Sequence, residues 1–228
     1  MFSWPADYES SWTLAGEINI NGIGLHTGQN SLVTLMPSEK PGFQLSWLDN
    51  PNEILSLDIN QIRNTPLCTT LEFDNRKLST VEHLLSALGG CGLSHVHIQV
   101  SGEEIPLLDG SALNWVEAIK STGLQPAKTK RKEPPILENS IVLNRGTSLI
   151  TATPSDTFKI IGIIDFPYPA IGKQVFSIDL TPENFVKDIA PARTFGFVDQ
   201  LETLKKSGLI KGGNLDNALV CDGESWVN

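Results

Sequence analysis

Residues 79–88 have the sequence STVEHLLSAL and predict an amphipathic helix that carries an acid and an imidazole side by side. Ser79 and Glu82 fit a capping box, in which each side chain would accept a hydrogen bond from the backbone N–H of the other residue. The apolar side chains recur at the spacing of one helical face: Val81, Leu84, Leu85 and Leu88. Glu82 and His83 fall outside this stripe, so both can face a cleft or solvent.

The segments on either side of this stretch predict strands and one further helix. Residues 13–20 alternate loosely between apolar and polar, and Asn21-Gly22 after them predicts a hairpin turn. The glycines within 89–92 predict the end of the first helix, and residues 95–100 alternate as in a half-buried strand. A second helix is expected from Ala112 to about Ser121.

Composition limits the classes of protein to which the chain can belong. A formal net charge of −9 over 228 residues argues against a protein that binds nucleic acid. The three cysteines have no paired spacing and suit a reducing compartment. We find no secretory signal at the N-terminus and no apolar run of the ~18 residues that a transmembrane helix needs. We therefore expect a cytoplasmic protein without a transmembrane segment, and peripheral contact with a membrane surface stays open.

The segment at 125–135 is the best candidate for a domain boundary. It has no apolar periodicity, and it combines a basic run with Pro134-Pro135. We expect one domain over residues 1–127 and a second over 133–228. Within the second, strands are predicted near 136–142, 147–153 and 158–165, and a helix near 198–206.

The pair Glu82-His83 allows two interpretations. In one, Glu82 only caps the helix and His83 is an exposed polar residue. In the other, the carboxylate is a general base beside a histidine that ligates a metal ion, because adjacent side chains on a helix diverge by about 100° and can address one bound water from two directions.

The other candidate residues carry weaker signals. His95 and His97 lie on the same face of the expected strand, and a His-x-His pair can ligate zinc, although a solvated face explains the pattern as well. His26 lies among closely spaced glycines, in a loop tight enough to position it for substrate contact. Thr194 offers a hydroxyl donor beside a cation, but it also fits a strand end. Cys68 has no pattern of its own that indicates a nucleophile.

These stretches together resemble the UDP-3-O-acyl-N-acetylglucosamine deacetylase family, the zinc amidases of lipid A biosynthesis in Gram-negative bacteria. The motifs that carry the resemblance span the chain from about Trp12 and occur in one order: Gly22–Gly28 (GIGLHTG), Leu67–Thr70 (LCTT), Ser79–Leu84 (STVEHL), Glu104–Ala112 (EIPLLDGSA), Ala192–Phe197 (ARTFGF) and Gly212–Ala218 (GGNLDNA).

The resemblance implies an α+β fold of two similar domains, each a β-sheet packed with helices, with the active site between them. It implies Zn²⁺ as the cofactor, with His83 as a ligand, Glu82 as the general base and Thr194 as the hydroxyl that holds the oxyanion. It also implies residues that contact the substrate, an acylated UDP-N-acetylglucosamine: His26, Leu67, Cys68, Phe195 and Gly213.

The sequence departs from the family pattern at its C-terminal end. Family members continue into a His-Lys-x-x-Asp helix with the other zinc ligands and then to a histidine that acts as general acid, and this chain ends at Asn228 before either. We therefore expect a chain truncated at the C-terminus, with an incomplete second domain. An alternative stays open, namely an inactive relative that at most binds the acylated UDP-sugar or a partner. The sequence predicts no oligomeric state.

Overall fold

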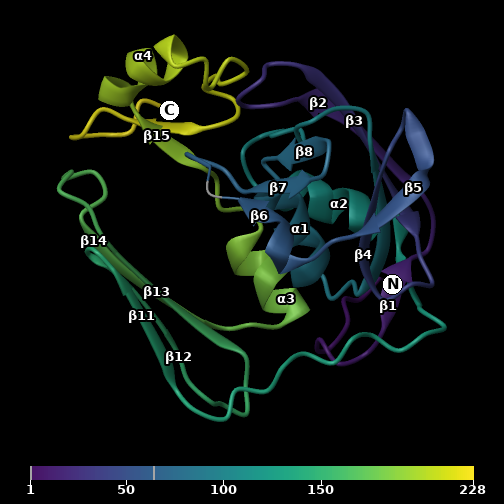
Figure 1. The fold of residues 1–228 in the computed structure, drawn as a ribbon. Coiled ribbons are helices and arrows are strands. Elements are labelled where there is room, and N and C mark those ends of the chain that lie inside the picture. The colour runs from purple at the N-terminus through teal and green to yellow at the C-terminus, as the bar shows by residue number, and fades with distance from the viewer. Residues whose placement is uncertain (1, 64) are drawn as a thin grey trace.

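The computed structural model describes residues 2–63 and 65–228. Figure 1 shows a mixed sheet and two helices formed by the first part of the chain, and long hairpins that extend away from them. Most of the strands form mixed or antiparallel sheets, with a few helices packed against them, which confirms the expected α+β class. None of the helices in the described residues is long and apolar enough to cross a membrane.

The largest sheet has seven strands and is centred on β9 (His95–Val100). This strand pairs with β3 in antiparallel and with β4 in parallel orientation, and it touches β1 in parallel at one position. The order along the main path is β10-β1-β9-β3-β2, and β4 carries β5. The other strands are β1 (Trp12–Leu14), β2 (Ile18–Ile23), β3 (Asn30–Pro37), β4 (Gly42–Trp47), β5 (Asn50–Ser56) and β10 (Leu124–Pro126).

Two helices and a smaller sheet complete the first part of the chain. Helices α1 (Glu82–Gly90) and α2 (Leu113–Thr122) confirm the two predicted there, and they pack on the sheet through a shared apolar core. A short 3-10 helix at Ile59–Gln61 leads into the three-stranded sheet, which ends directly before α1. Its strands are β6 (Ile62–Arg63), β7 (Thr70–Phe73) and β8 (Arg76–Ser79).

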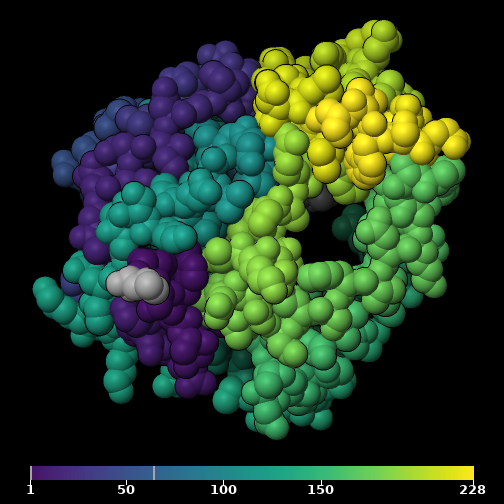
Figure 2. Space-filling model, turned by 180° about the vertical axis from the view of Figure 1, so that it is seen from behind, coloured from purple at the N-terminus to yellow at the C-terminus, as the bar shows by residue number. Residues whose placement is uncertain are grey.

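The rest of the chain forms two hairpins and a compact C-terminal segment. The hairpins pair β11 (Ile141–Arg145) with β12 (Ser148–Ala152), and β13 (Lys159–Asp165) with β14 (Lys173–Asp179). Figure 2 shows an open space bordered by the hairpins, the segment after them and the C-terminal residues. Two short helices follow the hairpins, and β15 then pairs in parallel with β16. These elements are α3 (Pro182–Asn184), a π-helix at Phe185–Ile189, β15 (Phe195–Phe197), α4 (Val198–Lys206) and β16 (Leu219–Cys221).

The segment after the hairpins returns to the first core. Phe185 and Ala190 are buried in the same apolar cluster as α1 and the large sheet. Figure 1 shows α3 beside α1, and a Cβ on Gly90 would overlap the ring of Phe185. The helix ends in two glycines, and the second of them lets this ring approach the helix backbone.

Two local predictions are wrong. Asn21-Gly22 is not a hairpin turn, because both residues pair with β3 inside β2 and the chain turns only over residues 24–29. The capping box at Ser79 and Glu82 does not form, because Ser79 belongs to β8 and the N-cap of α1 is Val81 without a side-chain cap. In both cases pairing with a neighbouring strand overrides a favourable local sequence.

Candidate active site

The first turn of α1 presents its carboxylate to the neighbouring loop. Glu82 accepts a hydrogen bond at Oε2 from the backbone N–H of Thr69 at 3.1 Å. Thr69 follows Cys68 in the LCTT motif, so this bond joins two of the motifs of the sequence. Glu82 is only partly buried, and the Thr69 N–H is the donor to its carboxylate among the residues that the structure describes.

His83 lies beside the loop that carries Asp109 and Ser111. Burial lowers the pKa of His83, although the charges of Glu82 and Asp109 and the backbone of Ser111 act in the opposite direction. The net effect favours the neutral imidazole at neutral pH. Neutral imidazole is the form that ligates a metal ion, so this environment suits the role that the resemblance implies.

Thr194 reaches the same loop from a distant part of the sequence. Its backbone N–H donates to the carbonyl oxygen of Gly110 at 2.7 Å, and its methyl group lies where a Cβ on Gly110 would contact it. The neighbouring Arg193 donates from Nε to the carbonyl oxygen of Asp109 at 2.7 Å. Thr194 and His83 therefore both lie beside the loop at 109–111, although they are more than a hundred positions apart in the sequence.

Phe195 extends this region with an aromatic surface. Its ring is 41% exposed and makes edge contacts with Phe166 at 5.7 Å and with Trp226 at 6.1 Å between centroids. Beside Phe195, the rings of Tyr168 and Phe197 stack on each other with 4.4 Å between their centroids. These rings form an apolar surface next to the polar residues of the candidate site.

His26 is held inside the turn at 24–29 and lies near Cys68. The His26 side chain is only 8% exposed, and neither ring nitrogen has a hydrogen-bond partner among the described residues. The Cys68 thiol is the largest influence on His26 and raises the pKa of the imidazole. Burial would raise the pKa of Cys68, but His26, Thr70 and Thr65 together lower it.

Leu67 and Gly213 lie at the edges of this arrangement. Leu67 directly precedes Cys68, adopts a φ of 64° and is 57% exposed. Gly213 lies in the turn that covers the His26 segment, where the N–H of Gly212 donates to the carbonyl oxygen of Leu25 at 3.0 Å. A residue with a Cβ at position 212 would overlap the carbonyl of Gly24, so the two turns are in close contact.

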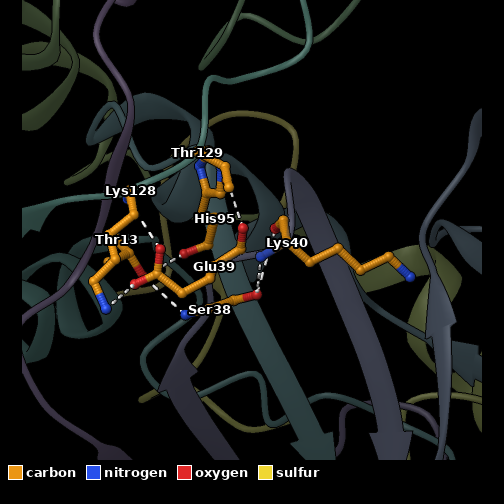
Figure 3. A network of polar contacts seen from close by, with 7 residues as sticks. All are labelled: Thr13, Ser38, Glu39, Lys40, His95, Lys128 and Thr129. Atoms are coloured by element: carbon orange, nitrogen blue, oxygen red, sulfur yellow. Dashed lines mark hydrogen bonds and ion pairs between the residues drawn. The ribbon is translucent and has the colours of Figure 1, made fainter.

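His95 and His97 lie outside this arrangement, on the central strand of the sheet. The His95 ring is fully buried, and its Nε2 lies 2.9 Å from the hydroxyl of Thr129 (Figure 3). Its Nδ1 lies 2.8 Å from the hydroxyl of Ser94. His97 is 2.8 Å from the hydroxyl of Ser46. The two rings lie on the same face of the strand, and each is hydrogen-bonded to a hydroxyl group. The prediction that His95 faces solvent is wrong, because Thr129 and the segment at 125–135 cover its ring.

The residues that could hold a metal ion are sparse in the part of the chain that the structure describes. Residues 2–63 and 65–228 contain no cluster of three His, Cys, Asp or Glu side chains with the geometry of a metal site. A catalytic zinc ion takes three protein ligands and a water. The described residues thus do not fit a complete zinc centre, and His83 with its neutral ring fits as one ligand.

Glu104 is the important residue that sequence reasoning misses. The sequence around it predicts only a turn before the second helix, whereas the structure buries its carboxylate to 2% exposure beneath the His26 turn. An acid directly before the apolar run Ile105-Pro106-Leu107-Leu108 is the available signal, because a carboxylate in such a setting must find donors.

The comparisons with known proteins cover nearly the whole chain. A protein-family model described as UDP-3-O-acyl N-acetylglycosamine deacetylase matches residues 11–228. The chain is 40% identical over 219 residues to the UDP-3-O-acyl-N-acetylglucosamine deacetylase of Synechocystis sp., covering 95% of this chain and 79% of that one. The protein of the same name from Thermosynechococcus vestitus is 41% identical over 218 residues, with 95% and 75% covered. That of Geobacter sp. is 35% identical over 218 residues, with 95% and 71% covered.

Proposed function

The chain belongs to the UDP-3-O-acyl-N-acetylglucosamine deacetylase family, and on that basis we propose that it hydrolyses the acetamide of UDP-3-O-acyl-N-acetylglucosamine in lipid A biosynthesis. Water adds to the acetyl carbonyl, the C–N bond breaks, and acetate and the free amine are the products. The observation that carries this proposal is the convergence of Glu82, His83 and Thr194 around the loops at 68–69 and 109–111.

Each of these residues has a part that its position supports. Glu82 is the general base and takes the proton of the attacking water, with the Thr69 N–H holding one of its oxygens in place. Thr194 donates its hydroxyl to the oxygen of the tetrahedral intermediate, and its backbone bond to Gly110 fixes the side chain against the loop. His26, Leu67, Cys68 and Gly213 line the substrate side, and Phe195 with its aromatic neighbours faces the acyl chain.

We propose Zn²⁺ as the metal, with His83 as one ligand. When bound, such an ion polarises the carbonyl and lowers the pKa of its bound water to about 7. The described residues bring no cluster of three metal ligands together. The catalytic roles proposed above, general base and oxyanion donor, are therefore assigned to Glu82 and Thr194 and do not depend on the ion. The compartment we propose is the cytoplasm, in keeping with the sparse, unpaired cysteines.

The same lack of a three-ligand cluster among the described residues favours a second candidate, binding of the acylated UDP-sugar without turnover. Zinc content, acetate release and substrate binding, measured together on one preparation, distinguish the two. His83→Gln removes the proposed ligand, and His97→Gln is the matched control because His97 faces Ser46 in the sheet.

Deacetylation predicts about one zinc per chain together with acetate release, both lost in His83→Gln and kept in His97→Gln. Substrate binding without zinc and without acetate would support the second candidate and contradict the first.

A further inference from the structure

We propose that Glu104 is a positioning residue for this site, one that fixes the His26 turn and the start of α1 in a single arrangement from beneath. The inference rests on the proposed function for its catalytic consequence, and on the described contacts for its geometry. Glu104 does not touch the proposed reacting groups. It acts through the residues that carry them.

The carboxylate of Glu104 receives four hydrogen bonds, two on each oxygen. Oε1 accepts from the backbone N–H of His26 at 2.8 Å and from the hydroxyl of Thr80 at 2.9 Å. Oε2 accepts from the backbone N–H of Thr27 at 2.8 Å and from its hydroxyl at 2.6 Å. One side chain thereby joins two segments that are more than fifty positions apart in the sequence.

The turn is shaped around this carboxylate. Gly24 lies so close that a Cβ on it would overlap Oε2 of Glu104. The turn closes through the N–H of Gly28, which donates to the carbonyl oxygen of Gly24 at 3.1 Å, and Gly28 adopts a φ of 66°. Because the glycines of the GIGLHTG motif have no side chains, the turn leaves room for the buried carboxylate of Glu104. The carboxylate in turn orients the backbone that carries His26.

The other branch of the network reaches the helix with Glu82 and His83. Thr80 is 1% exposed and adopts a φ of 58°, which is strained for a β-branched residue and needs support from its surroundings. Its hydroxyl bond to Glu104 supplies part of that support. Because Thr80 lies two positions before Glu82, its conformation sets where the helix begins and where Glu82 points.

The outer face of the His26 turn is hydrogen-bonded to a third segment of the chain, at 211–212. The carbonyl oxygen of Leu25 accepts from the N–H of Gly212, and that of His26 accepts from the N–H of Lys211 at 3.4 Å. Gly213, proposed to contact the substrate, comes next. Glu104 thus supports backbone positions in three of the motifs, two through the His26 turn and one directly through Thr80.

The charge of Glu104 is balanced by hydrogen-bond donors alone, since it takes part in no ion pair among the described residues. A carboxylate can accept four bonds on two oxygens, whereas a carboxamide has one accepting oxygen and would turn its N–H groups toward the donors. Glu104→Gln is therefore nearly isosteric and selectively disrupts the network. Glu103→Gln is the matched control, because Glu103 is the exposed neighbour and the change in charge is the same.

The test measures kcat and KM per folded molecule well below the melting temperature, and backbone amide exchange at His26 and Thr27 by NMR. We expect Glu104→Gln to lower kcat by about 10- to 100-fold, which is about 1.4–2.8 kcal/mol at 1.4 kcal/mol per tenfold, because hydrogen bonds to a charged carboxylate are stronger than those to a neutral group. Exchange at the two amides should rise by a similar factor, with amides of β9 unchanged. Glu103→Gln should match the wild type in all of these.

A purely structural role would lower the melting temperature of Glu104→Gln but leave kcat per folded molecule at the wild-type value, and that result would overturn the proposal. If Glu104→Gln does not fold, Thr27→Val removes one donor at constant shape, and an unchanged kcat in this variant would also overturn it. Faster exchange at His26 and Thr27 in Glu104→Gln, combined with no turnover by the wild type, would support the anchoring and contradict the deacetylase function.

Discussion

The backbone N–H of Thr194 donates to the carbonyl oxygen of Gly110 at 2.7 Å, and this bond brings a late segment of the chain against the loop beside His83. Arg193 secures the same contact through the carbonyl oxygens of Asp109 and Asp216. The hydroxyl of Thr194 is thereby presented from a backbone that is fixed on both sides, which is what a donor to a developing oxyanion requires.

Thr194→Val should lower deacetylation by about 10²-fold, because the loss of one oxyanion donor removes stabilisation of the transition state while the shape is kept. Thr194→Ser retains the hydroxyl and should stay much closer to the wild type. Steady-state kinetics of the three proteins checks this, and equal rates for Thr194→Val and the wild type would remove Thr194 from the mechanism.

The two glycines that end α1 should respond in opposite ways to alanine. A Cβ on Gly89 would have no neighbouring atom within 4 Å, so Gly89→Ala should stabilise the helix by about 0.5–1 kcal/mol. A Cβ on Gly90 would overlap the Phe185 ring, so Gly90→Ala should destabilise by about 1–3 kcal/mol. Urea unfolding measures both, and equal effects would show that Phe185 does not pack on the helix end.

The Cys68 thiol should react at a lower pH than an ordinary cysteine. Burial raises the pKa of Cys68, but the hydrogen bonds with His26, Thr70 and Thr65 and the charge of His26 together outweigh burial and lower it. The thiolate therefore forms at a pH below the ordinary pKa of 9.0. Alkylation by iodoacetamide as a function of pH should show a midpoint below that of a free thiol. His26→Gln should move the midpoint upward.

Cys91 provides the internal comparison for this experiment. Burial raises the pKa of its thiol and its side chain is fully buried, so it should react only after unfolding. An alkylation midpoint for Cys68 that His26→Gln leaves unchanged would show that the imidazole does not stabilise the thiolate.

Acid should remove the stabilising contribution of Glu104. Burial raises its pKa, but hydrogen bonds from His26, Thr27 and Thr80 outweigh this and lower it below the ordinary value of 4.5. A carboxyl whose pKa is lower in the folded state stabilises the protein above the unfolded pKa, and loses that effect as the pH falls through the folded one.

The free energy of unfolding of Glu104→Gln should therefore fall below that of the wild type by about 2–3 kcal/mol at neutral pH, with the gap narrowing below about pH 4. Glu103→Gln serves as the control for the change in charge. A gap that stays constant between pH 7 and pH 3 would contradict the assignment of the charged form.

Periodicity predicts the helices well and local turn signals predict the connections poorly. The helices at 82–90, 113–122 and 198–206 are all predicted, the first of them from its apolar spacing, which is a property of the local chain. Asn21-Gly22 lies inside a strand because pairing with Ser31 and Leu32 extends past it. The strand at 173–179 and the helical turns at 182–189 are not among the predicted elements, although Thr181 followed by Pro182 is a helix-start signal that the structure uses as an N-cap.

The candidate site is predictable only as far as resemblance can place its residues. Glu82, His83 and Thr194 are identified from motifs, and no spacing in the sequence indicates that Thr194 meets Gly110. Glu82 is expected to bond the amide of Ser79 and instead bonds that of Thr69, a contact across two motifs. The division into domains at 1–127 and 133–228 stays a prediction.

Acetate release from UDP-3-O-acyl-N-acetylglucosamine by the wild type and by Glu82→Gln, with Zn²⁺ supplied, tests the proposed function most directly. We predict measurable release by the wild type and a rate about 10²–10⁴-fold lower for Glu82→Gln, with substrate binding retained, since only the proton acceptor is lost. No release by the wild type, or equal rates in the two proteins, would contradict the account.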